Sequence, residues 1–595
     1  MLDSYWTDRG FPWEHDPGPP ANRTWARLFA ETPNYRGIGK AAIGHEAFRW
    51  HFGPMFYRGR LGDGQVRVLV VGQEGAQDES LAHRSFSGGT GARMQHLLRH
   101  LGITRSYLFL NTFVYPIFGQ YGAELRVLAQ HVASPIRIHR ERIFDYLVAR
   151  NDVHLAIGVG TAAKESLASW VASHGGNANP AKLHEADATV ISPRLQMLGV
   201  LHPGGASAGG ATAIIADFKA AARRVARWRT DDAGWLPADA DGQIQPPDDY
   251  RYRSAPIPFR DLPYGLPWRI GRGGTSSNRR DGQAAIQLFS ADGAYNNSGH
   301  SLSYTGSVAG TRTGYVDEPG DLPYEPPRAR FAEFDRGPGT PFARLLQGGE
   351  SGFGWPDFAT LGLRAHPSLG HGPVYRGRLD RPGILVLADQ ASHDDLFTGR
   401  AATGDDGQHL QAFLRAAGLT ARYAILRVLP IDTLGETAAR VRAAVDSSAT
   451  GALYAEAIRR SDPDVVLAVG PSARGLVAHH APLGGRPLVE MAAYGATGWK
   501  PSWQQALVRL GTLTYARDVA QPAFSYEGER EQIPRIDLPY GTLRWQGSSG
   551  DRGQRARRGS NPSFDYYKLA MPAWTVALDP RPLTAGEQQT IDGLV

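Results

Sequence analysis

The chain contains the same strand–loop–helix segment twice. Residues 384–420, ILVLADQASHDDLFTGRAATGDDGQHLQAFLRAAGLT, align without a gap to the segment that begins at Val68. Flanking motifs recur in the same order: YRGRL at 57–61 and 375–379, LAIGVG at 155–160 with LAVGPS at 467–472, and DLPYG at 261–265 and 537–541. Because the same landmarks recur in order, the sequence predicts two copies of one folding unit.

Each copy alternates apolar, β-branched runs with helical patterns. In the first copy the predicted strands are 66–71, 107–112, 153–158 and 196–201, and the predicted helices are 90–101, 137–150, 161–173 and 211–229. Consecutive strands that are joined by helices run parallel, and the helices cover both faces of the sheet. The predicted fold class is therefore α/β, with two tandem three-layer α/β/α modules built on mostly parallel sheets.

Shifts in composition divide the chain into four parts. These are a first module at 1–230, a linker and basic appendage at 231–340, a second module at 341–515 and a basic C-terminal appendage at 516–595. Residues 230–260 and 315–340 are rich in Pro, Asp and Gly, which is typical of linkers. The segments 261–314 and 537–595 are predicted to be irregular and β-rich.

The composition excludes several classes of protein. The 595 residues are 42% hydrophobic, which is ample for two cores, and they include no cysteine. Without cysteine there are no disulfides, iron–sulfur clusters or thiolate zinc sites. The N-terminus lacks the apolar core of a secretory signal, and no stretch approaches the ~20 apolar residues of a membrane helix. We therefore expect a soluble, cytoplasmic protein with no membrane partner, and no obligate protein partner is evident.

The charge is a weak indication of nucleic acid as a partner. The net charge is +6, and most of the positive charge is arginine, whose planar fork suits phosphates and base edges. Basic runs at 269–280 and 552–558 suit contacts with the phosphate backbone. In the first run the predicted DNA-binding residues are Arg269, Arg272, Arg279 and Arg280.

Polar residues follow the predicted strands of the first copy. Glu74 lies just after the first strand, Asn111 ends the second, and His202 follows the fourth. Since the carboxyl ends of parallel strands meet at one edge of a sheet, these residues are expected to converge, with Phe86 in the loop beside them. This set suits a flipped nucleobase: the ring stacks on it, the amide reads its edge, and the carboxylate and imidazole drive chemistry.

These segments resemble four motifs of the uracil-DNA glycosylase superfamily. GQEGAQDES (72–80) is similar to a first motif written GQDPY in one branch and GEAPGADED in another, and RSFSGGTG (84–91) is similar to RPFVGRAG. YLFLNTFV (107–114) resembles the strand that ends in a base-reading Asn, and LHPGGA (201–206) resembles the final HPS or HPA motif. The resemblance covers residues 45–229, with a fainter echo over 365–515, and it implies two modules of this fold.

The resemblance implies a role for each matched residue. Glu74 would orient or deprotonate the attacking water and stabilise the oxocarbenium charge; Asp78 is the alternative, because one branch carries its acid at the position of Gln73. His202 would hydrogen-bond the departing base. The implied base-binding residues are Gln73, Gly75, Ala76, Phe86 and Asn111. The implied DNA contacts in the loops are Gly88, Gly89, Gly204, Gly205 and Ser207. No cofactor or metal is implied, and since no lysine lies in the motifs, the product would be an abasic site.

Departures from the family pattern bear on the substrate. GQDPY branches carry a Tyr that excludes 5-substituted pyrimidines, and this chain has Ala76 there, preceded by Gly75 in place of Pro. The smaller side chain would open space beside C5 of the base. The loop after His202 has no large apolar wedge, so another element would fill the vacated stack. We therefore expect a monofunctional DNA glycosylase that hydrolyses the N-glycosidic bond of a noncanonical or 5-modified pyrimidine, bulky modified cytosines of phages included, with a role in antiphage defence.

The second copy lacks the same residues. Gln390, Ala402 and Arg427 hold the positions of the carboxylate, the stacking ring and the base-reading amide, and no His-Pro pair follows its last strand. This copy is therefore predicted to be a degenerate module, used for DNA grip, strand opening or scaffolding.

Other interpretations of these residues stay open. Ordinary uracil repair predicts activity on uracil DNA, whereas a non-enzymatic DNA-binding protein predicts that both copies lack catalysis. Taken singly, Glu74 could be an exposed loop acid, Phe86 a core residue and Asn111 a turn cap, and His202 could belong to an ordinary strand-end turn. An NTPase is disfavoured, because no Gly-Lys-Ser/Thr phosphate loop is present.

Overall fold

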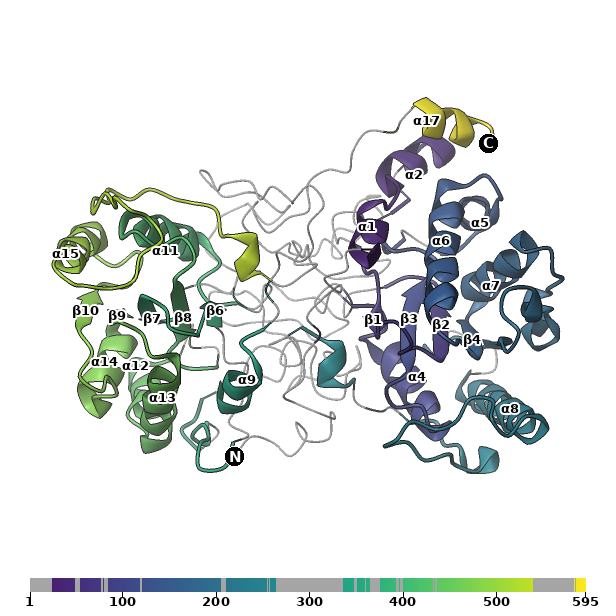
Figure 1. Cartoon of the computed structure of the whole chain (residues 1–595), viewed down its shortest axis with the longest axis horizontal. Coiled ribbons are helices and arrows are strands. Elements are labelled where there is room, and N and C mark those ends of the chain that lie inside the picture. Colours follow the sequence, from purple (N-terminus) through teal and green to yellow (C-terminus); the bar gives the residue numbers. More distant parts are fainter. Residues whose placement is uncertain are drawn as a thin grey trace.

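The computed structural model forms two α/β modules, each with its own five-stranded sheet (Figure 1). It describes residues 16, 24–45, 47–48, 54–75, 79, 84–117, 120–204, 210–253, 255, 257–263, 335, 337–346, 350–358, 360–363, 375–391, 395, 400–431, 433, 436–538, 583 and 585–594. No helix in these ranges is both long and apolar enough to cross a membrane.

The first sheet has one antiparallel edge strand and four parallel strands. Its strands are β1 (Arg58–Gly59), β2 (Val68–Gly72), β3 (Tyr107–Asn111), β4 (Leu155–Val159) and β5 (Gln196–Val200), in the order β1-β3-β2-β4-β5. Only β1 runs antiparallel to its neighbour. The apolar runs that predicted β2, β3 and β4 are buried throughout, as in parallel strands that are covered on both faces. The predicted α/β class is therefore confirmed.

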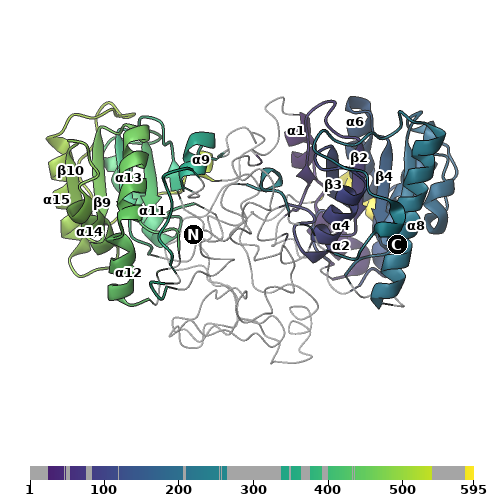
Figure 2. The same ribbon diagram turned by 90° about the horizontal axis from the view of Figure 1, so that it is seen from below.

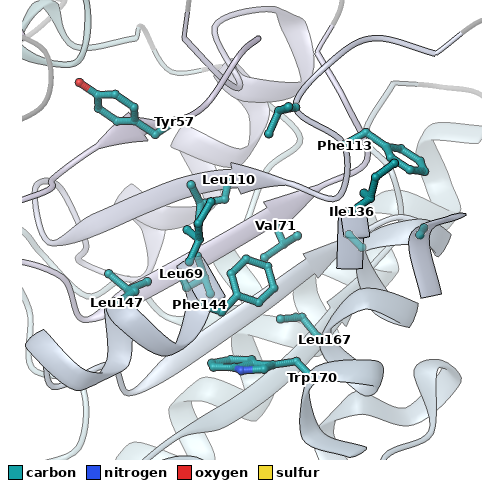
Figure 3. Packing of buried hydrophobic residues seen from close by; sticks show 14 of the residues in the cluster. Tyr57, Leu69, Val71, Leu110, Phe113, Ile136, Phe144, Leu147, Leu167 and Trp170 are labelled. Atoms are coloured by element: carbon teal, nitrogen blue, oxygen red, sulfur yellow. The ribbon is translucent and has the colours of Figure 1, made fainter. Parts of the chain in front are cut away.

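Helices cover both faces of this sheet, which makes three layers. On one face lie α1 (Thr24–Ala30), α2 (Tyr35–Ile43), α5 (Ala123–Gln130), α6 (Pro135–Arg150) and α7 (Thr161–Ser173), and on the other lie α4 (Gly89–His100) and α8 (Gly210–Asp231). Figure 3 shows the first interface, where Leu69 and Val71 of β2 face Phe144 of α6 and Trp170 of α7. Alternate residues of β2 (Val68 and Val70) pack against α4 and α8 instead. Each such buried aliphatic side chain contributes roughly 1.5–3 kcal/mol.

The second module, drawn in green in Figure 2, repeats the strand order of the first. Its strands are β6 (Tyr375–Gly377), β7 (Ile384–Ala388), β8 (Tyr423–Arg427), β9 (Val465–Val469) and β10 (Leu488–Met491), in the order β10-β9-β7-β8-β6. Again only the first strand is antiparallel to its neighbour. Its helices are α9 (Thr340–Leu346), α11 (Asp405–Ala416), α12 (Ala438–Val445), α13 (Ser448–Ser461), α14 (Pro471–His480) and α15 (Trp499–Gly511). The duplication seen in the sequence is thus a duplication of structure.

A buried ion pair explains why YRGRL and DLPYG recur together. In the first module Arg58 Nη1 lies 2.6 Å from Asp261 Oδ2, and the Tyr107 hydroxyl donates to the same oxygen at 2.6 Å. In the second module Arg376 lies 3.0 Å from Asp537. Both acids lie far along the chain from their arginines, so each pair fixes the segment after the last helix onto its own sheet.

The segment predicted as a linker after α8 packs onto the first module. Trp235, Leu236 and Tyr250 are buried and belong to the same core as α4 and α8. We call residues 232–255 the strap. Its Asp239 accepts the backbone N–H groups of residues 104–106 at 2.6–3.1 Å, which fixes the turn before β3.

The C-terminal segment differs from its prediction where the structure describes it. Residues 585–592 form a helix, α17, rather than a β-rich segment, and Ile591 is buried against α2 of the first module. Eight residues with one buried apolar side chain are too few to reveal a helical period in the sequence. The rest of the predicted β-rich segments, 264–314 and 539–582, lies outside the described residues.

Candidate functional site

The carboxyl ends of the parallel strands bring the predicted site residues to one edge of the first sheet. Gly72 of β2 lies opposite Asn111 of β3 in the parallel register, and Glu74 follows Gly72 by two residues. On the other side of β2, Gly160 at the end of β4 donates its N–H to the Val200 carbonyl at the end of β5 at 3.0 Å, two residues before His202. The strand ends that carry these residues therefore lie at one edge of the sheet, as the strand order predicted.

Phe86 and Asn111 meet over Gly72. A β-carbon placed on Gly72 would lie 2.5 Å from Cζ of the Phe86 ring and 2.7 Å from Asn111 Oδ1, so only glycine fits there. Asn111 is 5% exposed; its Nδ2 donates to Ser85 Oγ at 3.4 Å, and its Oδ1 accepts no hydrogen bond within the described part of the chain. A buried amide acceptor beside an aromatic ring is a place where a ligand N–H would restore a missing hydrogen bond.

The loop that carries Phe86 has a strained backbone. Phe86 has φ 54°, in the left-handed region that bulky residues rarely adopt. A Cβ added to Gly91 would lie only 1.6 Å from the Phe86 carbonyl oxygen, so position 91 must be glycine. The ring is 6% exposed and lies 4.9 Å from Phe109, so Phe86 is also part of the core on this face. Both interpretations of Phe86 as a core residue and as a site residue are thus compatible with its position.

Residues to which the sequence analysis gave no role fix this loop. Arg84 Nε donates to Asp16 Oδ2 at 2.6 Å, and the Tyr57 hydroxyl donates to the same carboxylate at 2.8 Å. Glu79 Oε1 accepts the N–H of Gly88 at 3.1 Å, directly before α4 begins at Gly89. Since Asp16 and Tyr57 are remote in sequence from the loop, no local pattern could have revealed these contacts.

His202 is held in one tautomer by its own loop. Its Nδ1 accepts the Gly204 N–H at 3.0 Å, so the proton of the neutral ring is on Nε2, which lies 3.4 Å from Thr90 Oγ1 in the first turn of α4. Although part of the ring is exposed, the surrounding protein lowers the pKa of His202, and the charge of Arg93 lowers it further. At neutral pH the site therefore offers a neutral imidazole with one donor, Nε2–H.

The His202 loop is anchored from α4, α8 and the strap. The Pro203 carbonyl accepts hydrogen bonds from Arg93 and from the Tyr252 hydroxyl, the latter at 2.7 Å. Asp217 of α8 accepts the Leu201 N–H at 2.6 Å, and burial raises the pKa of this carboxyl. Arg93, Asp217 and Tyr252 are far from one another in the sequence, and only the fold brings them to the His202 loop.

The remaining predicted residues are only partly described. Gln73 and Glu74 are half-buried after β2, and Gly75 is buried where a Cβ would lie 2.1 Å from Met55 Sδ, so its role in the structure is close packing. Gly88 caps α4, and Gly204 lies against the His202 ring. Outside the described residues lie Ala76, Asp78, Gly205, Ser207, Arg269, Arg272, Arg279 and Arg280.

The second module keeps the backbone of the site and places a guanidinium at the position of Asn111. Ala402, at the position of Phe86, has φ 50°, and a Cβ added to Gly407 would lie 1.8 Å from the Ala402 carbonyl oxygen. The backbone of the loop is therefore the same as in the first module, although the phenyl ring is absent. Arg427 is 6% exposed; its Nη2 donates to Gln390 Oε1 at 3.0 Å and to the Ile431 carbonyl. A guanidinium therefore occupies the position that Asn111 holds in the first module.

The described residues include no group of three or more His, Cys, Asp or Glu side chains that could hold a metal ion. A scan against models of protein families and a search of curated proteins found no match to this chain.

Proposed function

We propose that the first module is a DNA glycosylase that binds a flipped pyrimidine at the carboxyl edge of its sheet and hydrolyses the N-glycosidic bond. The observation that carries this proposal is the meeting of the Phe86 ring and the unsatisfied Asn111 Oδ1 over Gly72. An aromatic ring together with a buried hydrogen-bond acceptor is what recognition of an extruded base requires. The resemblance to the uracil-DNA glycosylase superfamily points to the same function.

In this mechanism each side chain acts on a different part of the nucleotide. Asn111 Oδ1 accepts a hydrogen bond from the base edge, and Glu74 orients the water and stabilises positive charge on the sugar. His202 Nε2–H donates to the base carbonyl oxygen as negative charge develops there. The N-terminus of α4 lies beside this donor, since Thr90 Oγ1 is 3.4 Å from Nε2, and its dipole favours the same charge. The base leaves as an anion, and the product is an abasic site.

The proposed substrate is a noncanonical or 5-modified pyrimidine. This part of the proposal depends on the sequence, in which Ala76 stands where related GQDPY motifs carry a Tyr that blocks 5-substituents. Bulky modified cytosines of phage DNA would fit such a pocket, which would make antiphage defence the biological role. Ordinary uracil repair is the alternative substrate class, and an assay with both kinds of DNA separates them.

Two substitutions test the site directly. Glu74→Gln removes the charge and should abolish most base release, and His202→Ala should lower the rate by roughly 100- to 1000-fold, as loss of one oxyanion donor does. Gln390→Ala replaces the residue of the second module that is equivalent to Glu74, and it should leave the rate of base release unchanged. Rates in Glu74→Gln and His202→Ala equal to wild type would refute the assignment of the site, and loss of activity in Gln390→Ala would move it to the second module.

A further inference from the structure

A cleft of about 470 Å³ lies between helix α4 and the strap. From α4 it is lined by His96, Arg99 and His100, and from the strap by Gln243, Gln245 and Arg253. All of these side chains carry hydrogen-bond donors in at least one protonation state, and two of them are permanently cationic. This cleft is separate from the candidate site, which lies at the other end of α4.

Helix α4 connects the cleft to the candidate site. The helix begins at Gly89 beside His202, and its next turn contributes Arg93, whose guanidinium lies 4.8 Å from the centre of the Tyr252 ring in the strap. His96 follows on the same side of the helix, with its ring 5.4 Å from Tyr250. At 1.5 Å per residue, Arg99 lies about 13 Å along the helix from Thr90. This is roughly four steps of a DNA strand at 3.4 Å per step.

The cleft carries positive charge that the described residues do not neutralise. Neither Arg99 nor Arg253 makes an ion pair or hydrogen bond to a side chain of the described residues. Asp241 also lines the cleft, but it is bonded to Thr104 and to Arg105, the latter at 3.2 Å, and Asp249 is the other acid near His100. Two buried ring nitrogens, His96 Nδ1 and His100 Nε2, have no hydrogen-bond partner in the described part of the chain.

The second module supplies an internal comparison. Its helix α11 has Ala412 and Ala416 at the positions of His96 and His100, and Arg415 at the position of Arg99. Arg415 is bonded to Glu531. Both modules have the same backbone hydrogen bond between the helix and the segment that follows. In the first module the Gln245 N–H donates to the His100 carbonyl at 2.9 Å, and in the second module the Phe524 N–H donates to the Ala416 carbonyl at 3.0 Å. The amide side chain of Gln245 is thus replaced by a phenyl ring in the second module. Within the described residues, the positions that line the cationic cleft of the first module are therefore held by other residues, or by a paired arginine, in the second.

We infer that this cleft binds one backbone phosphate of the DNA strand, about four nucleotides from the flipped base. Arg99 and Arg253 supply the charge-assisted hydrogen bonds, and the amides of Gln243 and Gln245 supply neutral donors. Phosphate contacts of this kind fix the register of a protein on DNA without reading its sequence. The inference rests on the proposed function, because it places the cleft relative to a flipped nucleotide.

The test measures binding of the full-length chain to a duplex with an abasic-site analogue, which does not require the base to be known. Each phosphate on either side of the analogue is replaced in turn by a neutral methylphosphonate. In wild type, one replacement about four nucleotides away should weaken binding by about tenfold. The Arg99→Ala/Arg253→Ala variant should bind about tenfold more weakly, respond no further to that replacement, and show a salt slope smaller by about 0.9. Arg415→Ala is the matched control and should behave as wild type.

The outcomes separate this inference from the proposed function. If wild type binds DNA but the double variant keeps its salt slope and its response to every methylphosphonate, the cleft does not bind phosphate and the inference is overturned. If one methylphosphonate weakens DNA binding as expected but wild type releases no base from any DNA, the phosphate site is upheld and the glycosylase function is overturned. If wild type does not bind DNA at all, both fail.

Discussion

In the second module the Arg427 guanidinium donates to Gln390 Oε1 at 3.0 Å, and these residues hold the positions of Asn111 and Glu74 in the first module. The contact shows that the two positions are adjacent at the sheet edge in this fold. Arg427 is buried there and lies 3.9 Å from the buried carboxylate of Asp395. The Arg427 side chain is therefore buried within the second module.

Arg427→Ala should therefore destabilise the second module without reducing base release. Breaking a buried ion pair by removing one partner costs about 3–5 kcal/mol, which denaturant unfolding of the full chain would measure. Arg442→Ala removes a largely exposed pair with Asp446 in the same module and should cost at most about 0.5 kcal/mol. Equal free energies of unfolding for the two variants would show that the buried contacts of Arg427 do not stabilise the second module.

The pH dependence of base release should report the state of His202. The surrounding protein and the charge of Arg93 lower the pKa of His202, although the residue is exposed, so the neutral form with its proton on Nε2 persists below the ordinary pKa of histidine. Protonation of Nδ1 would remove the acceptor for the Gly204 N–H and release the loop. Activity should thus stay level from pH 8 to below 6.5 and fall only at more acidic pH. A decline that begins above pH 6.5 and is absent in His202→Gln would contradict this account.

Asp261 should be essential for the stability of the first module. Its side chain is fully buried, and the charges of Arg60 and Arg58 hold its pKa below the usual range despite burial. Asp261→Ala should cost about 3–5 kcal/mol of unfolding free energy, because it leaves Arg58 buried without its counter-charge. Asp248→Ala removes an exposed pair with Arg223 and should cost about 0–1 kcal/mol. A small effect of Asp261→Ala would mean that the recurrent DLPYG motif has another purpose.

The sequence predicted the central strands and helices because their signals are local. Apolar, β-branched runs and helical periodicity predicted β2, β3 and β4 to within about two residues, and recurrence of the motifs predicted the second sheet. Helices α1, α2 and α5 were not predicted. The strap has the Pro, Asp and Gly content of a linker, and its buried residues Trp235 and Tyr250 are too far apart to show a period.

The candidate site divides in the same way. Glu74, Asn111 and His202 were identifiable because each ends or follows a strand, and parallel order alone places strand ends together. Arg93 and Tyr252 could not be identified, since they act by binding the carbonyl of Pro203 across the fold. A contact of that kind has no sequence period and no fixed spacing.

Base release from a panel of DNA duplexes tests the central claim most directly. The panel would contain uracil, 5-hydroxymethylcytosine, its glucosylated form and unmodified DNA, with alkaline cleavage to reveal abasic sites and Glu74→Gln as the inactive control. We predict Glu74-dependent cleavage of the DNA with the bulky modified base and none of unmodified DNA. Cleavage of uracil DNA alone would keep the glycosylase and refute the open pocket at Ala76. No cleavage of any duplex, with tight binding retained, would contradict the account and leave a DNA-binding protein in its place.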